Sequence, residues 1–121
     1  MSDPTGLWRA HLGDGRYREV LIHDDGTGWT ESGRRSSYEC ITEFTWSLTE
    51  PDRMEFTYGE CREVEDGRVS HTWPAQDHSA HRFTVGERAD PDGPVFVLTL
   101  DQTLLGAAEF TRKAVPGRRT G

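Results

Sequence analysis

The sequence predicts an all-β fold, an antiparallel up-and-down meander of eight or nine strands that closes into a barrel. Two observations predict it. Apolar and polar residues alternate with a period of two along most of the chain, and clusters of Gly, Asp and Pro interrupt the alternation at short intervals. No stretch shows helical periodicity. A meander of this many strands usually closes, because closure removes its unpaired edges.

Nine segments carry the alternation and are predicted to be strands. They are Leu7–Leu12, Tyr17–His23, Gly28–Gly33, Tyr38–Leu48, Arg53–Val64, Arg68–Trp73, Ser79–Glu87, Pro94–Leu100 and Leu105–Lys113. Residues that tolerate positive φ or fix a bend separate several of them: Gly13-Asp14-Gly15, Asp25-Gly26, Glu50-Pro51-Asp52, Asp66-Gly67 and Asp92-Gly93. Such short connections predict sequential hairpins.

The length of 121 residues predicts one domain over residues 1–121, with flexible tails at 1–5 and 115–121. Apolar residues make up only 33% of the chain, yet it contains four Trp, three Tyr and five Phe. Large aromatic side chains suit a thin shell of strands, because they can span an interior that no helix layer fills.

The charge and the apolar pattern exclude several kinds of partner. A net charge of −7 argues against nucleic acid, because phosphate binding needs clustered cationic side chains. There is no apolar run of membrane-spanning length and no signal-peptide pattern at the first residues, so we expect a cytoplasmic protein without a membrane partner. A homodimer remains open.

No metal or cofactor is expected. Cys40 and Cys61 are too few and too far apart in sequence for a CxxC metal or redox motif. His78 and His81 lie three positions apart in or near a strand, so they point to opposite faces and cannot hold one ion together.

Turn chemistry also predicts which residues face each other. A two-residue turn at Asp25-Gly26 puts Ile22 opposite Trp29. The hairpin around Pro51 matches apolar residues on an inward face, and the Asp66-Gly67 turn extends that face unless Gly59 forms a β-bulge. The predicted pairs are Leu48 with Met54, Trp46 with Phe56, Phe44 with Tyr58, Val64 with Val69, Arg62 with His71, and Glu60 with Trp73.

This register predicts a pocket with aromatic walls and one polar end. Small-molecule sites combine apolar walls with a few fixed polar groups, and a His beside a Glu can act as a general base. The candidate catalytic pair is His71 with Glu60; the candidate ligand-binding residues are Phe44, Trp46, Phe56, Tyr58, Arg62, Trp73, His81 and Arg112. The alternative is that Glu60, Arg62 and His71 form a structural cluster at the barrel rim.

Two further expectations concern single side chains. The same register places Cys40 inward and Cys61 outward, so no disulfide between them is expected. Arg112 either receives a ligand carboxylate through its planar guanidinium or lies over Trp8 as a structural cation–π contact.

Two short motifs resemble those of lipocalins and related calycins. Gly6-Leu7-Trp8 is similar to their G-x-W opening, and Asp25-Gly26-Thr27-Gly28 is similar to a D-G-T-G hairpin of bacterial lipocalin-like domains. The resemblance implies an eight-stranded barrel with a central cavity. It also implies that Trp8 closes one end of the barrel and that Arg112 packs across it.

Three functions follow as hypotheses. The first is binding of a small apolar or aromatic molecule in a central barrel cavity. The second is a cofactor-free cyclase or isomerase of natural-product biosynthesis, because holding a substrate in one conformation can supply much of the catalysis without a sequence motif. The third is a protein-interaction or inhibitor domain that uses an acidic surface.

Overall fold

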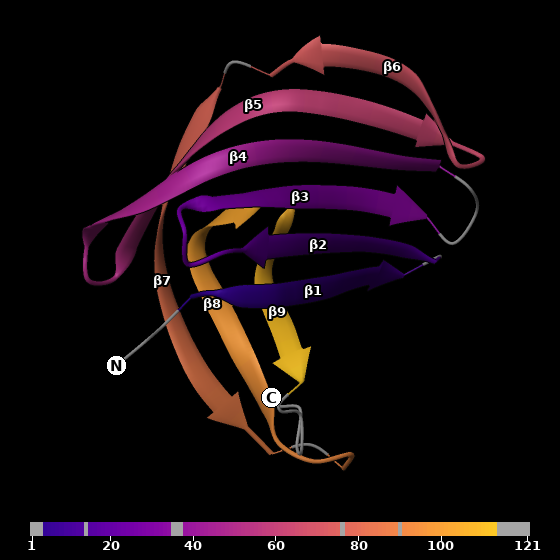
Figure 1. Cartoon of the computed structure of the whole chain (residues 1–121). Coiled ribbons are helices and arrows are strands. Elements are labelled where there is room, and N and C mark those ends of the chain that lie inside the picture. The colour runs from indigo at the N-terminus through magenta and orange to yellow at the C-terminus, as the bar shows by residue number, and fades with distance from the viewer. Residues whose placement is uncertain (1–3, 14, 35–37, 76, 90, 114–121) are drawn as a thin grey trace.

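A computed structural model of the chain describes residues 4–13, 15–34, 38–75, 77–89 and 91–113 (Figure 1). The described residues form antiparallel strands and no helix, which confirms the predicted all-β class. The strands are β1 (Gly6–Gly13), β2 (Arg16–Ile22), β3 (Thr27–Arg34), β4 (Tyr38–Glu50), β5 (Arg53–Glu65), β6 (Arg68–Pro74), β7 (His78–Arg88), β8 (Val95–Leu104) and β9 (Ala107–Lys113). Within these ranges no helix is long and apolar enough to span a membrane.

Eight of the strands form a closed ring in the order β1-β2-β3-β4-β5-β7-β8-β9. The ring closes between β1 and β9, where Arg9 pairs with Thr111. Strand β6 lies outside the ring, because it pairs only with the second half of β5 while β7 takes the first half. Figure 1 shows β6 at the free edge of the sheet, with β7, β8 and β9 crossing behind the first strands.

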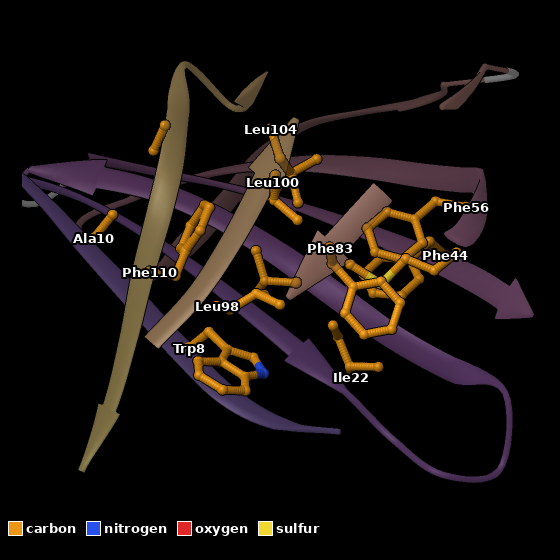
Figure 2. Packing of buried hydrophobic residues seen from close by; sticks show 13 residues of the cluster. Trp8, Ala10, Ile22, Phe44, Phe56, Phe83, Leu98, Leu100, Leu104 and Phe110 are labelled. Carbon is orange, nitrogen blue, oxygen red and sulfur yellow. The ribbon is translucent and has the colours of Figure 1, made fainter. Parts of the chain in front are cut away.

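Core side chains fill the interior of the ring (Figure 2). The rings of Phe44 and Phe56 stack with their centroids 4.5 Å apart. Trp8, Phe56 and Phe110 are completely buried. Most of the buried side chains follow the alternation along the strands, so the period of two correctly predicted the inward face at these positions.

The register around Pro51 is confirmed. Leu48 pairs with Met54, Trp46 with Phe56, and Phe44 with Tyr58. The connection itself differs from the expected three-residue loop, because Glu50 pairs with Arg53 across a two-residue turn and Thr49 is an extra residue in β4. Thr49 thus forms a β-bulge, and the apolar pairs keep their predicted register.

Beyond Tyr58 the expected register is wrong. Thr42 pairs with Cys61, so two residues of β5, Gly59 and Glu60, lie opposite Glu43 alone. This bulge reverses the direction of every following side chain of β5. The inward residue is therefore Cys61, which is 5% exposed.

A separate register shift, an extra residue at Ser70 in β6, changes the partners of β6. Cys61 pairs with Trp73 and Glu63 with His71, in place of the predicted Glu60 and Arg62. The pair Val64 and Val69 is confirmed, because it lies between the Asp66-Gly67 turn and the extra residue at Ser70.

The first predicted turn is also wrong by one residue. Ile22 pairs with Gly28, and Leu21 rather than Ile22 pairs with Trp29. The connection is longer than Asp25-Gly26 because the Asp25 carboxylate accepts hydrogen bonds from the backbone N–H and the hydroxyl of Thr27, at 3.0 and 2.6 Å. Trp29 consequently projects from the outer face of the sheet.

Trp8 is completely buried near the start of β1, at one end of the ring. Its indole N–H donates to the carbonyl oxygen of Pro4 at 2.8 Å, and the guanidinium carbon of Arg112 lies 4.6 Å from the ring centroid. Arg112 also donates to the carbonyl of Thr5. Pro4 and Thr5, expected in a flexible tail, pack against this end; residues 1–3 and the expected tail 115–121 lie outside the described residues.

Candidate functional site

A hollow of about 460 Å³ lies over strands β3, β4 and β5. It is lined by one short stretch of each strand, residues 27–29, 43–45 and 57–59, and by His23 from the β2–β3 connection. The three stretches lie side by side, because Gly28 pairs with Phe44 and Phe44 pairs with Tyr58. A volume of this size suits a small organic molecule.

The hollow opens on the outer face of the barrel. The middle residues of the three stretches, Gly28, Phe44 and Tyr58, belong to the inward row, so their backbone forms the floor. The neighbouring outward residues form the walls: Thr27, Thr45 and Thr57 on one side, and Trp29, Glu43 and Gly59 on the other. Gly59 has no side chain, so this wall has a gap beside Glu43.

The chemistry of the walls favours a neutral, partly aromatic ligand. Trp29 offers an indole ring and the three Thr residues offer methyl groups and hydroxyls. Glu43 is the acidic wall residue, and its carboxylate lies 3.1 Å from the Arg62 guanidinium. The indole N–H of Trp46 donates to the carbonyl of His23 at 2.6 Å and holds the connection that borders the hollow.

Beneath the floor, a hydrogen-bonded chain links β5, β7 and β8. The Tyr58 and Ser79 hydroxyl oxygens are 2.9 Å apart, and Ser79 lies 2.9 Å from Nε2 of His81. Nδ1 of His81 lies 3.1 Å from the backbone carbonyl oxygen of Gln102.

The carbonyl of Gln102 determines which group donates and which accepts in each of these hydrogen bonds. A carbonyl only accepts, so Nδ1 of His81 carries the proton and donates it. Nε2 then accepts from the Ser79 hydroxyl, and Ser79 accepts from Tyr58. His81 is only 2% exposed. This burial lowers its pKa and keeps the imidazole neutral in the hydrogen-bonded series. Burial likewise raises the pKa of Tyr58.

The residues predicted to line one pocket do not lie together in the structure. Phe44 and Tyr58 border the hollow, whereas Phe56 is fully buried in the core. Trp46 packs at the edge of the core. His81 faces inward as expected, but its ring nitrogens are engaged with Ser79 and Gln102.

The predicted polar end is divided between two faces of the sheet. Glu60 and Arg62 lie 3.6 Å apart as an ion pair on the outer face. His71 and Trp73 lie on the face that carries Cys61, with their rings 5.6 Å apart. The structure therefore does not bring His71 together with Glu60 or Arg62, because the extra residue at Ser70 in β6 shifts His71 to pair with Glu63.

Two other expectations can be located. Arg112 lies over Trp8, which is the structural alternative of the two considered. His78 is exposed while His81 is buried. In the part of the chain that the structure describes, no three His, Cys, Asp or Glu side chains gather as a metal site requires.

Sequence reasoning missed the outer hollow. The predicted turn put Trp29 opposite Ile22, and Thr27, Thr45 and Thr57 are not among the predicted site residues. The signal that could have found them is an aromatic residue on a β-branched outer face, next to glycines that leave space.

Comparisons with known proteins do not assign the chain: no family model, no curated protein and no solved structure matches it significantly.

Proposed function

We propose that the protein binds a small apolar or aromatic molecule in the hollow over β3, β4 and β5. The observation that carries the proposal is a space of about 460 Å³ with an indole wall at Trp29 and no side chain at Gly59 beside Glu43. An aromatic ligand can lie against Trp29, while the hydroxyls of Thr27, Thr45 or Thr57 orient its polar atoms.

The hollow is a better binding site than the interior between Phe44 and Phe56. The two rings are stacked, and both side chains belong to the packed core. A ligand there would have to displace core side chains, which costs packing energy that an open hollow does not demand.

A cofactor-free cyclase or isomerase is the second candidate, and one observation favours it. The chain from Tyr58 through Ser79 to His81 connects a residue at the hollow to a neutral imidazole that can take up a proton. Binding ranks above catalysis because His81 is buried and the hydroxyls of the chain already bond to each other. The catalytic roles of His71 and Glu60 stay predictions.

Kinship with lipocalins and other calycins is part of the same proposal. Support comes from the eight-stranded ring and from the stacking of Arg112 on Trp8, which the resemblance implied. A cytoplasmic location, the absence of nucleic-acid and membrane partners, and the open question of a homodimer stay predictions drawn from the sequence.

The test is a titration with the neutral fluorescent probe N-phenylnaphthylamine. Its emission rises and shifts to the blue in an apolar site. Trp29→Ala removes the aromatic wall, and Thr45→Trp fills the hollow from the opposite wall. Each should weaken binding at least about tenfold, which corresponds to roughly 1.4 kcal/mol.

The matched control is Val69→Ala, which removes an apolar side chain, 58% exposed, from β6, where it pairs with Val64 beyond the residues that line the hollow. It should leave the dissociation constant unchanged. Equal affinity in folded Trp29→Ala, Thr45→Trp and unmodified protein would refute the site. Native mass spectrometry of the purified protein then identifies any molecule that it retains.

A further inference from the structure

We propose that Cys40 and Cys61 form a reversible disulfide that links β4 to β5 across the sheet. The two Sγ atoms lie 3.2 Å apart, and both thiols are free in the structure. This proposal is independent of ligand binding in the hollow.

The bulge at Gly59 brings Cys40 and Cys61 to the same face of the sheet. Cys40 pairs with Glu63 and Cys61 with Thr42, so the two cysteines are diagonal neighbours on the same face of adjacent strands. Without the extra residue, Cys61 would point to the opposite face, as the sequence had predicted. The expected separation of the two thiols is therefore wrong.

The surroundings distinguish the two thiols. Cys61 is only 5% exposed, and its sulfur lies 3.2 Å from the Thr42 hydroxyl. Cys40 is partly exposed. An oxidant from solution therefore reaches Cys40 first, and the shielded Cys61 resolves the product.

The reaction balances with a low-molecular-weight disulfide such as oxidised glutathione. The Cys40 thiolate attacks one glutathione sulfur, forming a mixed disulfide and releasing one glutathione thiolate. The Cys61 thiolate then attacks the Cys40 sulfur and releases the second. The protein loses two electrons and two protons, which leave with two molecules of reduced glutathione.

The reaction should be slow at neutral pH. Burial, with contributions from Cys61 and Glu63, raises the pKa of the Cys40 thiol to about 12. Only the thiolate attacks, so the rate should increase about tenfold per pH unit below that pKa. The pair then responds to sustained oxidation rather than to brief exposure.

The disulfide should form more favourably in the folded protein than in the unfolded chain. Folding already holds the two sulfurs together, whereas the unfolded chain must close a loop to join them. The bond would fix the two strands directly beyond the bulge, where β5 exchanges its partner β7 for β6.

The experiment equilibrates the protein with mixtures of reduced and oxidised glutathione, natively and in concentrated guanidinium chloride. After acid quenching and alkylation, trypsin releases peptides 36–53 and 54–62, which carry one cysteine each. We expect a crosslink between them, and an equilibrium constant for its formation at least about tenfold larger natively than in denaturant.

Cys40→Ser and Cys61→Ser are the matched controls. Cys61→Ser should stop at the mixed disulfide on Cys40, whereas the buried Cys61 of Cys40→Ser should resist glutathione in the folded state. Two results would overturn the proposal: an equilibrium constant no larger in the native protein than in denaturant, or mixed disulfides that accumulate in the unmodified protein without a crosslink. Circular dichroism confirms that each variant is folded.

Discussion

The guanidinium of Arg112, near the end of β9, stacks on the indole of Trp8 near the start of β1, with 4.6 Å between the guanidinium carbon and the ring centroid. The two strands share one residue pair, Arg9 with Thr111, so side chains contribute much of the ring closure at this place. Arg112 also contacts the ring of Phe96 in β8, at 5.1 Å.

Replacing Arg112 by Ala should lower the free energy of unfolding by about 1–2 kcal/mol, because it removes a shielded cation–π contact and the hydrogen bond to Thr5. Urea denaturation measures the change. Arg88→Ala is the matched control, since Arg88 and Glu109 form an exposed ion pair at 3.5 Å and should contribute less than about 0.5 kcal/mol. Equal effects of the two substitutions would contradict the structural role of Arg112.

Gly28→Ala should destabilise the protein by roughly 1–3 kcal/mol. A Cβ at Gly28 would collide with the backbone carbonyl oxygen of Leu21 and come within 2.6 Å of the Phe44 ring. Gly86→Ala is the control, because a Cβ there would meet nothing within 4 Å. Thermal unfolding should separate the two variants clearly, and a stable Gly28→Ala protein would mean that β2 and β3 are less closely packed than described.

The free energy of unfolding should fall in acid, because His81 is buried in its neutral form. Its folded-state pKa lies below the ordinary 6.5, so the unfolded chain takes up a proton that the folded protein resists. The stabilisation is present above pH 6.5 and is lost as the pH falls toward the lowered pKa, by at most about 1.4 kcal/mol per pH unit.

His81→Gln should remove most of this pH dependence, since an amide can also bond to Ser79 and Gln102 without titrating. His71→Gln, at an exposed position, should retain it. Melting temperatures measured across the acidic range test both. An unchanged acid slope in His81→Gln would show that another group is responsible.

Glu31 should have the opposite effect to His81 on how stability depends on pH. The hydroxyl of Tyr17 lies 2.7 Å from Glu31 and 3.1 Å from Glu39 on the outer face. Burial, together with the neighbouring Glu39, raises the pKa of Glu31. The folded state therefore holds this proton more tightly, and the resulting stability is lost as the pH rises from the ordinary carboxyl range through the raised pKa.

Glu31→Gln should therefore stabilise the protein near neutral pH. Partial exposure screens the interaction and keeps the gain at roughly 0.5–1 kcal/mol. The gain should disappear in acid, where Glu31 of the unmodified protein is protonated. Chemical denaturation at both pH values measures it, and a gain that persists in acid would point to packing instead of charge.

The alternation predicted all nine strands, and apolar matching predicted the pairs Trp46–Phe56 and Phe44–Tyr58. These features are local or involve a single hairpin, so the sequence carries them directly. The end of β8 was harder to predict: the strand continues to Leu104, because Leu105 and Gly106 adopt positive φ values of 57° and 83° and form the turn. A leucine in that conformation is not a turn signal that composition reveals.

Which residues share a face of the candidate site depended on single-residue shifts, one of which, the extra residue at Ser70, separated His71 from Arg62. The longer turn after Ile22 moved Trp29 to the outer face, and the bulge at Gly59 moved Cys61 inward and Glu60 outward. Side-chain direction reverses with every inserted residue, so a small local error in register inverts the rest of a strand.

The sequence by itself determined that this chain forms an antiparallel barrel, because alternation and turn residues act over a few positions. Only the tertiary structure decided which residues gather into a hollow, which imidazole is buried and which thiols meet. Those choices follow from where bulges fall when neighbouring strands compete for backbone hydrogen bonds and apolar contacts. That competition involves pairs such as Thr42 with Cys61, which lie far apart along the chain.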